Sequence, residues 1–359
     1  MCIRDRAGVL YFTAEDGGVR RLWKYDGSSA SMVAGAILQN PDNLLSLGGA
    51  LYFSGDDGAS GVELWRTDGT TTGMIADINP AGSSMPLNLI EVGGVLYFTA
   101  DNGVDGRELW RWNGAQAAMV TDINPAGSAN PANLVKIGDV LCFSADDGTH
   151  GRELWKVAGP TSNAELVKDI RPGPASTTFG EMASLGATLL FVADDGVYGR
   201  ELWRSDLTGL GTALVKDISP ADHSDPAGLT VFGGLLYFAA NDGTHGRELW
   251  RSDGTDFGTV MVKDIAPGGA GSDPAGLTDV NGILYFAADD GTNGRELWKS
   301  YDGTAGRTIL AADLAAGTAG SEPAGLAVAG NRLFFAADDA VVGRELWSQS
   351  SLPPGVLVN

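Results

Sequence analysis

Apolar and polar residues alternate along this chain in short runs, and the whole pattern recurs every 42–49 residues. The copy at 226–265 shows it plainly, with four runs rich in apolar and β-branched residues at 226–232, 235–240, 247–251 and 260–265. They are separated by Gly-Gly, Asp-Gly-x-x-Gly and Asp-Gly-Thr, which reach positive φ at little cost and are typical of β-hairpins. No segment carries a helical stripe of apolar residues of useful length. The pattern therefore predicts short antiparallel strands throughout.

Tryptophan marks the period of this pattern. Eight tryptophans, most of them in the tripeptide Glu-Leu-Trp, follow one another at 42–49 residues: Trp23, Trp65, Trp110, Trp155, Trp203, Trp250, Trp298 and Trp347. A period of this size is typical of proteins that stack one supersecondary unit which cannot bury its apolar face alone. Packing in a core is the expected role of these indoles, in preference to stacking on a ligand.

Four antiparallel strands in about 47 residues form one blade of a β-propeller. We therefore predict an all-β fold, a β-propeller of four-stranded antiparallel blades with about eight repeats. Counting gives three strands in 9–37, four in each of six units over 41–314, and three in 323–347. That total lies between the strand numbers of eight and seven blades. Seven closed blades with two spare strands is the alternative, as are a longer array cut at both ends and a β-solenoid.

The repeats divide the chain into one array with two short ends. Residues 7–349 form the predicted propeller. Residues 1–6 match no repeat and lack the apolar core of a signal peptide, so we expect a leader foreign to the natural chain. The tail at 350–359 contains a possible weak closing strand at 356–358. No segment approaches the about 20 consecutive apolar residues of a membrane helix.

Charge and cysteine content narrow the classes of partner. The formal net charge is −21, which repels nucleic acid and anionic lipid and attracts cations, although an acidic surface also serves solubility. The two cysteines, Cys2 and Cys142, provide no disulfide framework and no Cys-rich metal site. Cys142 replaces the tyrosine of a recurring Leu-Tyr-Phe strand and is expected to be a packed core thiol.

The recurring motif Gly-Arg-Glu-Leu-Trp-Arg-Ser-Asp-Gly-Thr, best seen at 246–255 and in the variant at 61–70, resembles the ELWxxDGT repeat family. The resemblance covers about 9–347. Some copies depart from it, since Arg21 stands in place of the glutamate in the first and Asn113 in place of the aspartate in the third. The resemblance implies a bacterial, secreted or surface-attached, propeller-like protein. It provides no catalytic residues to carry over.

Two acidic features of the repeat are candidates for chemistry. The Glu of Glu-Leu-Trp, as in Glu201 and Glu248, is expected to be buried and to cap the preceding Gly turn or pair with an arginine of a neighbouring blade. Near-identical copies do not provide the unlike environments that two catalytic carboxylates need. The second feature is a set of aspartates that antiparallel order brings to one end of a blade: Asp194 and Asp195 with Asp217, and Asp289 and Asp290 with Asp313. Such oxygens suit Ca²⁺, while Asp-Gly is also an ordinary turn former.

One position varies within an otherwise constant frame, the second x of Asp-Gly-x-x-Gly. Around the array it holds Ser60, Asp105, His150, Tyr198, His245, Asn293 and Val342. His150, Tyr198 and His245 fall in successive units and are the predicted ligand-binding residues, suited to a sugar or a peptide. The alternative is that exposed loop tips vary freely. The segment 177–181 also departs from the repeat.

Catalytic and phosphate-binding motifs are missing from the sequence. His150, His223 and His245 lie in loops without the signature of a triad or a zinc site, and neither a Walker A motif nor a Gly-x-Gly-x-x-Gly opening a helix occurs. We therefore predict no catalytic residues, no enzyme, and no cofactor apart from a possible calcium ion.

The function predicted from these features is a non-catalytic extracellular or cell-surface binding or scaffold module that displays variable loops on one propeller face. The alternatives are a lectin-like carbohydrate binder and a propeller-fold glycan lyase or hydrolase. The expected partner is a protein or glycan ligand, the expected location is extracellular or on the bacterial surface, and the expected state is a monomer without membrane insertion.

Overall fold

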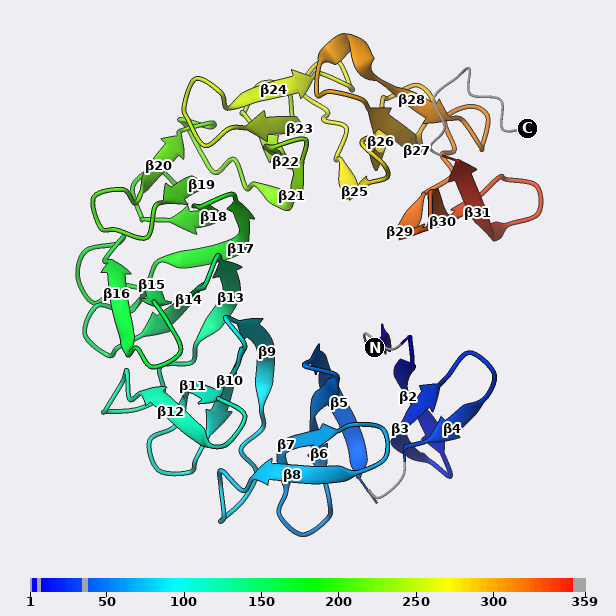
Figure 1. Ribbon diagram of the computed structural model, residues 1–359. Helices are drawn as coiled ribbons and strands as arrows, with labels where there is room; N and C mark the ends of the chain where they lie inside the picture. Colours follow the sequence, from blue (N-terminus) through cyan, green and yellow to red (C-terminus); the bar gives the residue numbers. More distant parts are fainter. Residues whose placement is uncertain (1, 5–7, 34–37, 351–359) are drawn as a thin grey trace. The chain divides into compact units, whose positions relative to one another are not determined.

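The computed structural model describes residues 2–4, 8–33 and 38–350, and they are almost entirely β-strand (Figure 1). The strands form eight antiparallel sheets, of which seven have four strands and one has three within the described residues. The prediction of an all-β propeller with about eight four-stranded repeats is confirmed. The chain divides into two compact units, Met1–Thr177 and Thr178–Asn359, with four sheets in each.

In the first unit, blade 1 is β1 (Cys2–Arg4), β2 (Leu10–Asp16), β3 (Val19–Tyr25) and β4 (Ala30–Met32), and blade 2 is β5 (Gln39–Leu47), β6 (Ala50–Asp56), β7 (Val62–Thr67) and β8 (Thr72–Ala76). Blade 3 is β9 (Leu87–Val92), β10 (Val95–Asp101), β11 (Arg107–Trp112) and β12 (Ala117–Thr121), and blade 4 is β13 (Ala132–Ile137), β14 (Val140–Asp146), β15 (Arg152–Val157) and β16 (Ala164–Lys168).

In the second unit, blade 5 is β17 (Thr178–Leu185), β18 (Thr188–Asp194), β19 (Arg200–Ser205) and β20 (Ala213–Lys216), and blade 6 is β21 (Ala227–Phe232), β22 (Leu235–Asn241), β23 (Arg247–Ser252) and β24 (Val260–Lys263). Blade 7 is β25 (Ala275–Asp279), β26 (Leu284–Asp289), β27 (Arg295–Ser300) and β28 (Thr308–Ala312), and blade 8 is β29 (Ala324–Ala329), β30 (Arg332–Asp338) and β31 (Arg344–Ser350). The one helical element in the described part is a 3₁₀ turn, η1 (Ala305–Arg307).

Each blade is a meander of hairpins, and glycine makes the tight turns possible. In blade 6 the hairpin between β21 and β22 turns at Gly233 and Gly234, whose φ angles of 58° and 80° are unfavourable for other residues. The register of β21 shifts against β22 between Ala227 and Thr230, as it does at the same place in most blades. This bulge re-aims the backbone of the first strand.

The two ends of the array differ from the predicted strand count. Residues Cys2–Arg4, which the sequence analysis assigned to a leader outside the repeats, form β1 and pair with β2. The first blade therefore has four strands, and the prediction of three was wrong. The predicted closing strand at 356–358 lies outside the described residues.

Within each unit, neighbouring sheets pack face to face, and their contact surface forms the core. Trp250, 7% exposed, lies in one cluster with Leu190 and Leu202 of blade 5 and Phe238 of its own blade. Trp298 packs in the same way on blade 6, and within the first unit Trp155 packs on blade 3. Cys142 is fully buried, as predicted, and burial raises the pKa of its thiol to about 12. Within a unit, these blades therefore bury apolar faces against their neighbours.

Because Trp250 joins two blades, replacing it with alanine is expected to remove apolar contact from both. We predict that Trp250→Ala lowers the free energy of unfolding by about 3–5 kcal/mol, measured by chemical denaturation. Leu210→Ala is the control, since Leu210 is fully exposed and should change stability little. Equal stability of the Trp250→Ala variant and the wild type would contradict this packing role.

Candidate functional site

A buried glutamate ties the third strand of each complete repeat to the segment that follows the fourth strand, which we call the link. Glu63, Glu108, Glu153, Glu201, Glu248 and Glu296 are all 0% exposed. In blade 5 the carboxylate of Glu201 accepts hydrogen bonds from the amides of Ile218 and Ser224 at 3.1 Å each and from the Ser224 hydroxyl at 2.6 Å. These bonds satisfy a charge that would otherwise be costly to bury.

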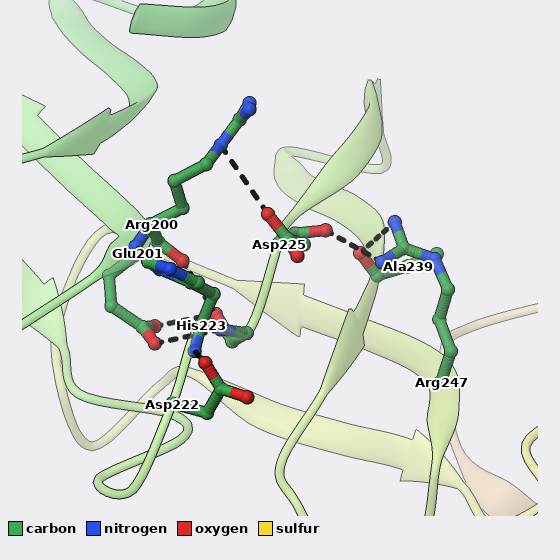
Figure 2. A network of polar contacts seen from close by, with 8 residues as sticks. Arg200, Glu201, Asp222, His223, Asp225, Ala239 and Arg247 are labelled. Atoms are coloured by element: carbon green, nitrogen blue, oxygen red, sulfur yellow. Dashed lines mark hydrogen bonds and ion pairs between the residues drawn. The ribbon is translucent and has the colours of Figure 1, made fainter. Parts of the chain in front are cut away.

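The structural role predicted for these glutamates agrees with their contacts, but the predicted partners were wrong. Glu201 and Glu248 bond to the link, as in the 2.6 Å bond from the Ser272 hydroxyl to Glu248. The neighbouring arginines are engaged elsewhere. Arg200 lies 3.4 Å from the carboxylate of Asp225, and Arg247 donates to the carbonyl of that residue at 2.7 Å (Figure 2).

Blade 3 lacks one of the donors that the other glutamates have. In five blades the link provides a hydroxyl to the carboxylate, from Ser84, Thr177, Ser224, Ser272 or Ser321. At that place blade 3 has Ala129, so Glu108 accepts from the amides of Ile123 and Ala129 at 3.1 and 2.8 Å. Burial raises the pKa of Glu108 to about 7, against the opposing effect of these amides.

The Asp-Gly loop between the second and third strands is closed by its own aspartates. In blade 5, Asp194 accepts from the amide of Gly196 at 2.7 Å, and Asp195 accepts from the amides of Val197 and Tyr198 at 2.9 and 3.0 Å. Asp290 closes the corresponding loop of blade 7 in the same way. The second aspartate of the motif is therefore a turn former, which was the alternative to calcium binding.

The variable loop position is partly explained by the same aspartate. His150 Nδ1 lies 2.7 Å from Asp147 Oδ2, and His245 Nδ1 lies 2.8 Å from Asp242 Oδ2. The hydrogen bond to the aspartate raises the pKa of each histidine above its ordinary value. Tyr198 makes no such bond in the described structure, and its side chain is 46% exposed. Two of the three predicted ligand-binding residues therefore bond back to their own loops.

A surface cavity of about 510 Å³ lies where the Asp-Gly loop of blade 5 meets the link of that blade. It is lined by Asp194, Tyr198, Asp217, Asp222 and His223, among others. The convergence that the sequence predicted for the aspartates before β19 and after β20 is confirmed here by Asp194 and Asp217. His245 is not among the residues that line this cavity, and His150 belongs to the other unit.

Two of the lining residues exist in no sister blade. Asp222 and His223 occupy the link position at which blades 2 and 3 have Gly82-Ser83 and Gly127-Ser128. The Arg200 amide donates to His223 Nδ1 at 2.8 Å, as the Arg107 amide donates to the Ser128 hydroxyl at 3.0 Å. This bond occupies Nδ1 and leaves Nε2 to hold the proton of the neutral ring.

The cavity is strongly anionic. Three carboxylates line it, those of Asp194, Asp217 and Asp222, and no lysine or arginine is among the lining residues. Asp217 Oδ1 is buried and has no hydrogen-bond partner in the described structure, as is also true of Asp169 and Asp264 in their own blades. The unpaired atom is therefore common to several repeats, and the three carboxylates give this cavity a negative charge, which favours a ligand that carries positive charge.

Metal and membrane interactions receive no new support from the geometry. Within the residues that the structure describes, no group of three or more His, Cys, Asp or Glu side chains is placed to hold a metal ion. Calcium stays a prediction, as does the extracellular or surface location. None of the helical segments in the described ranges has the length and apolar character that crossing a membrane requires.

Sequence reasoning found Tyr198 and the two aspartates of this cavity but missed Asp222 and His223. The signal was present, because aligning the links shows a bulky charged and aromatic pair in place of Gly-Ser. The motifs did not show that this pair would line one cavity with Tyr198, since the link and the Asp-Gly loop meet only after the blade is folded.

Comparison with known proteins found similarity to peptidases of solved structure. No family model and no curated protein matches the chain. It is similar to a puromycin-hydrolysing peptidase of Mycobacterium tuberculosis, with 11% identity, a TM-score of 0.46, and coverage of 92% of this chain and 56% of that one. For a puromycin hydrolase the values are 13%, 0.47, 94% and 57%, and for prolyl endopeptidases 14%, 0.46, 86% and 47%.

These neighbours correct the predicted function. The predicted function, a non-catalytic binding or scaffold module with a lectin or a glycan-cleaving enzyme as alternatives, is corrected by this finding: the solved structures that match are peptidases. The predicted location is not tested by them. The chain spans 47–57% of the length of these peptidases. Their activity is therefore not assigned to it.

The missing hydroxyl of blade 3 leads to a prediction about stability and pH. Because the pKa of Glu108 is raised to about 7 in the folded protein, its contribution to stability is present below pH 4.5 and is lost as the pH rises through about 7. Ala129→Ser supplies a donor to the ionised carboxylate. We expect it to raise the free energy of unfolding by about 1–2 kcal/mol at pH 8 and by less at pH 5.

The measurement is chemical denaturation of both proteins at the two pH values. Ala126→Ser, on an exposed position of the same link, is the matched control and should show no pH-dependent gain. A gain for Ala129→Ser that is the same at both pH values would disprove the link to ionisation of Glu108.

Proposed function

We propose that the protein binds basic segments of peptides, with the cavity of blade 5 holding one lysine or arginine side chain. The observation that carries this proposal is the cavity of about 510 Å³ with three carboxylates, an aromatic wall and no basic side chain of its own. Its volume is within the usual range of ligand pockets, about 300–1,000 Å³.

Each lining group supports recognition of a cation. Asp217 lines the cavity with a carboxylate, which attracts an ammonium or guanidinium group. Asp194 and Asp222 add negative charge at the same cavity. The half-exposed ring of Tyr198 offers a face for a cation–π contact, worth about 0.5–2 kcal/mol.

The charge of the whole chain supports the same ligand class. A net charge of −21 attracts basic peptides over several ångströms and accelerates their association, most strongly at low salt. The contacts inside the cavity then select among cationic side chains, because surface charge alone does not distinguish one from another.

The proposal predicts that a short lysine-containing peptide with blocked ends binds, while its twin with acetylated lysine does not. The measurement is titration calorimetry at low and at moderate salt. Asp217→Asn and Tyr198→Ala should each weaken binding by about tenfold, or about 1.4 kcal/mol, whereas Tyr198→Phe should keep the ring face and the affinity.

The matched control gives the link of blade 5 the sequence that blades 2 and 3 have at the same place. In Asp222→Gly/His223→Ser the link of blade 5 takes the Gly-Ser sequence of blades 2 and 3, where the serine hydroxyl accepts the bond that His223 accepts now. The fold and the melting temperature should persist while the affinity falls. Equal affinity of the acetylated and unmodified peptides would contradict the proposal.

A further inference from the structure

In blade 6 the first strand, β21, binds a carboxylate from the neighbouring blade. The amides of Gly228 and Leu229, at the bulge of β21, donate to the carboxylate of Glu181 in the neighbouring strand β17, at 3.1 and 2.8 Å. Glu181 lies five residues before its hairpin glycine, Gly186, as Gly228 lies five before Gly233. The carboxylate therefore comes from the matching position of the preceding blade, and the amide pair is a carboxylate-binding element.

Blade 8 has the same amide pair without that carboxylate. Gly325 begins the bulge of β29 with a φ of 64°, close to the 69° of Gly228, so the two backbones present their amides alike. The matching position of the preceding blade is Gly276, which has no side chain. In the described residues no side chain accepts a hydrogen bond from Gly325 or Leu326.

A cavity of about 430 Å³ opens at this amide pair, and its charge is unusual for the chain. Gly276, Gly325 and Leu326 line it together with Arg295, Arg344 and Glu322. Two arginines against one glutamate make it locally positive in a protein of net charge −21. Such a charge favours an anion.

The two arginines differ in how many of their N–H donors remain available to a ligand. Arg295 is held by the carbonyl of Asp273 at 2.8 Å, by that of Ala287 at 3.4 Å, and by Glu322 at 3.9 Å. Arg344 makes one long bond, 3.4 Å to the carbonyl of Ala336, and is exposed. Its guanidinium thus retains the donors that pair with a carboxylate.

We propose that this cavity of blade 8 binds a carboxylate, held by the amides of Gly325 and Leu326 as Glu181 is held in blade 6, and paired with Arg344. The ligand class is a free carboxylate, either the C-terminus of a peptide or a small organic acid. The site is separate from the anionic cavity of blade 5 and does not depend on the function proposed for that cavity.

The test is amide NMR of the full chain during titration with N-acetylglycine, with N-acetylglycinamide as the uncharged twin. The Gly325 and Leu326 amide resonances are expected to shift with the acid and not with the amide. A concentration of about 10 mM suffices for a site with a Kd of about 1 mM. Arg344→Gln should weaken the acid's binding several-fold without lowering the melting temperature.

Blade 6 provides the positive control. Glu181→Ala empties the equivalent amide pair, so the Gly228 and Leu229 resonances of that variant should respond to the same acid. If they respond while Gly325 and Leu326 do not, or if the acid and its amide act alike on blade 8, the proposal is wrong.

A second titration identifies the source of the carboxylate. A short peptide with a free C-terminus that binds more tightly than N-acetylglycine, and loses its affinity when amidated, assigns the site to a peptide end. Equal affinity of the peptide and N-acetylglycine assigns it to small organic acids. Either result requires the shifts at Gly325 and Leu326 that the proposal predicts.

Discussion

The buried carboxylate of Glu-Leu-Trp is the constraint on which the repeat depends. A glutamate with no exposed surface must find donors, and those donors are the amides and hydroxyl of the link that follows the fourth strand. The bonds to Glu201 hold the link against the third strand. Because the next strand starts where the link ends, one ionic group specifies both the closing of a blade and the start of its neighbour.

This arrangement leaves the ends of the blades free to differ. The link and the Asp-Gly loop are held by backbone and glutamate contacts, so the side chains that they display can change without loss of the fold. Blade 5 uses this freedom through Asp222 and His223. The cavity at blade 8 arises because blade 7 has Gly276 where blade 5 has Glu181. The two cavities carry opposite charge, although both arise from the same repeat.

A residue that differs between repeats at the variable loop position is not by that fact a ligand-binding residue. His150 and His245 looked like exposed binding groups in the sequence, but each bonds to the aspartate three residues before it. Ring nitrogens and amides at this position can repeat the same contact, as Asn293 does with Asp290. Tyr198 lacks a bond of this kind and faces a cavity instead. Variation in a turn therefore has to be judged by whether the new side chain still closes the turn.

The sequence by itself determined the period, the strands, and the burial of tryptophan and of six glutamates, because alternation, hairpin turns and the cost of a buried charge are local properties that recur along the array. It also brought Asp194 and Asp217 together, since antiparallel order puts their loops at one end of a blade. Only the tertiary structure decided that β1 completes the first blade, that Glu201 bonds to its link, and that Tyr198 and His223 line one cavity. The bonds of Glu201 and His223 join residues 17–23 apart, whose meeting depends on how folded strands and links pack rather than on any local pattern. Strand β1 pairs with the nearby β2, but its residues match no repeat, so the repeat pattern did not reveal it.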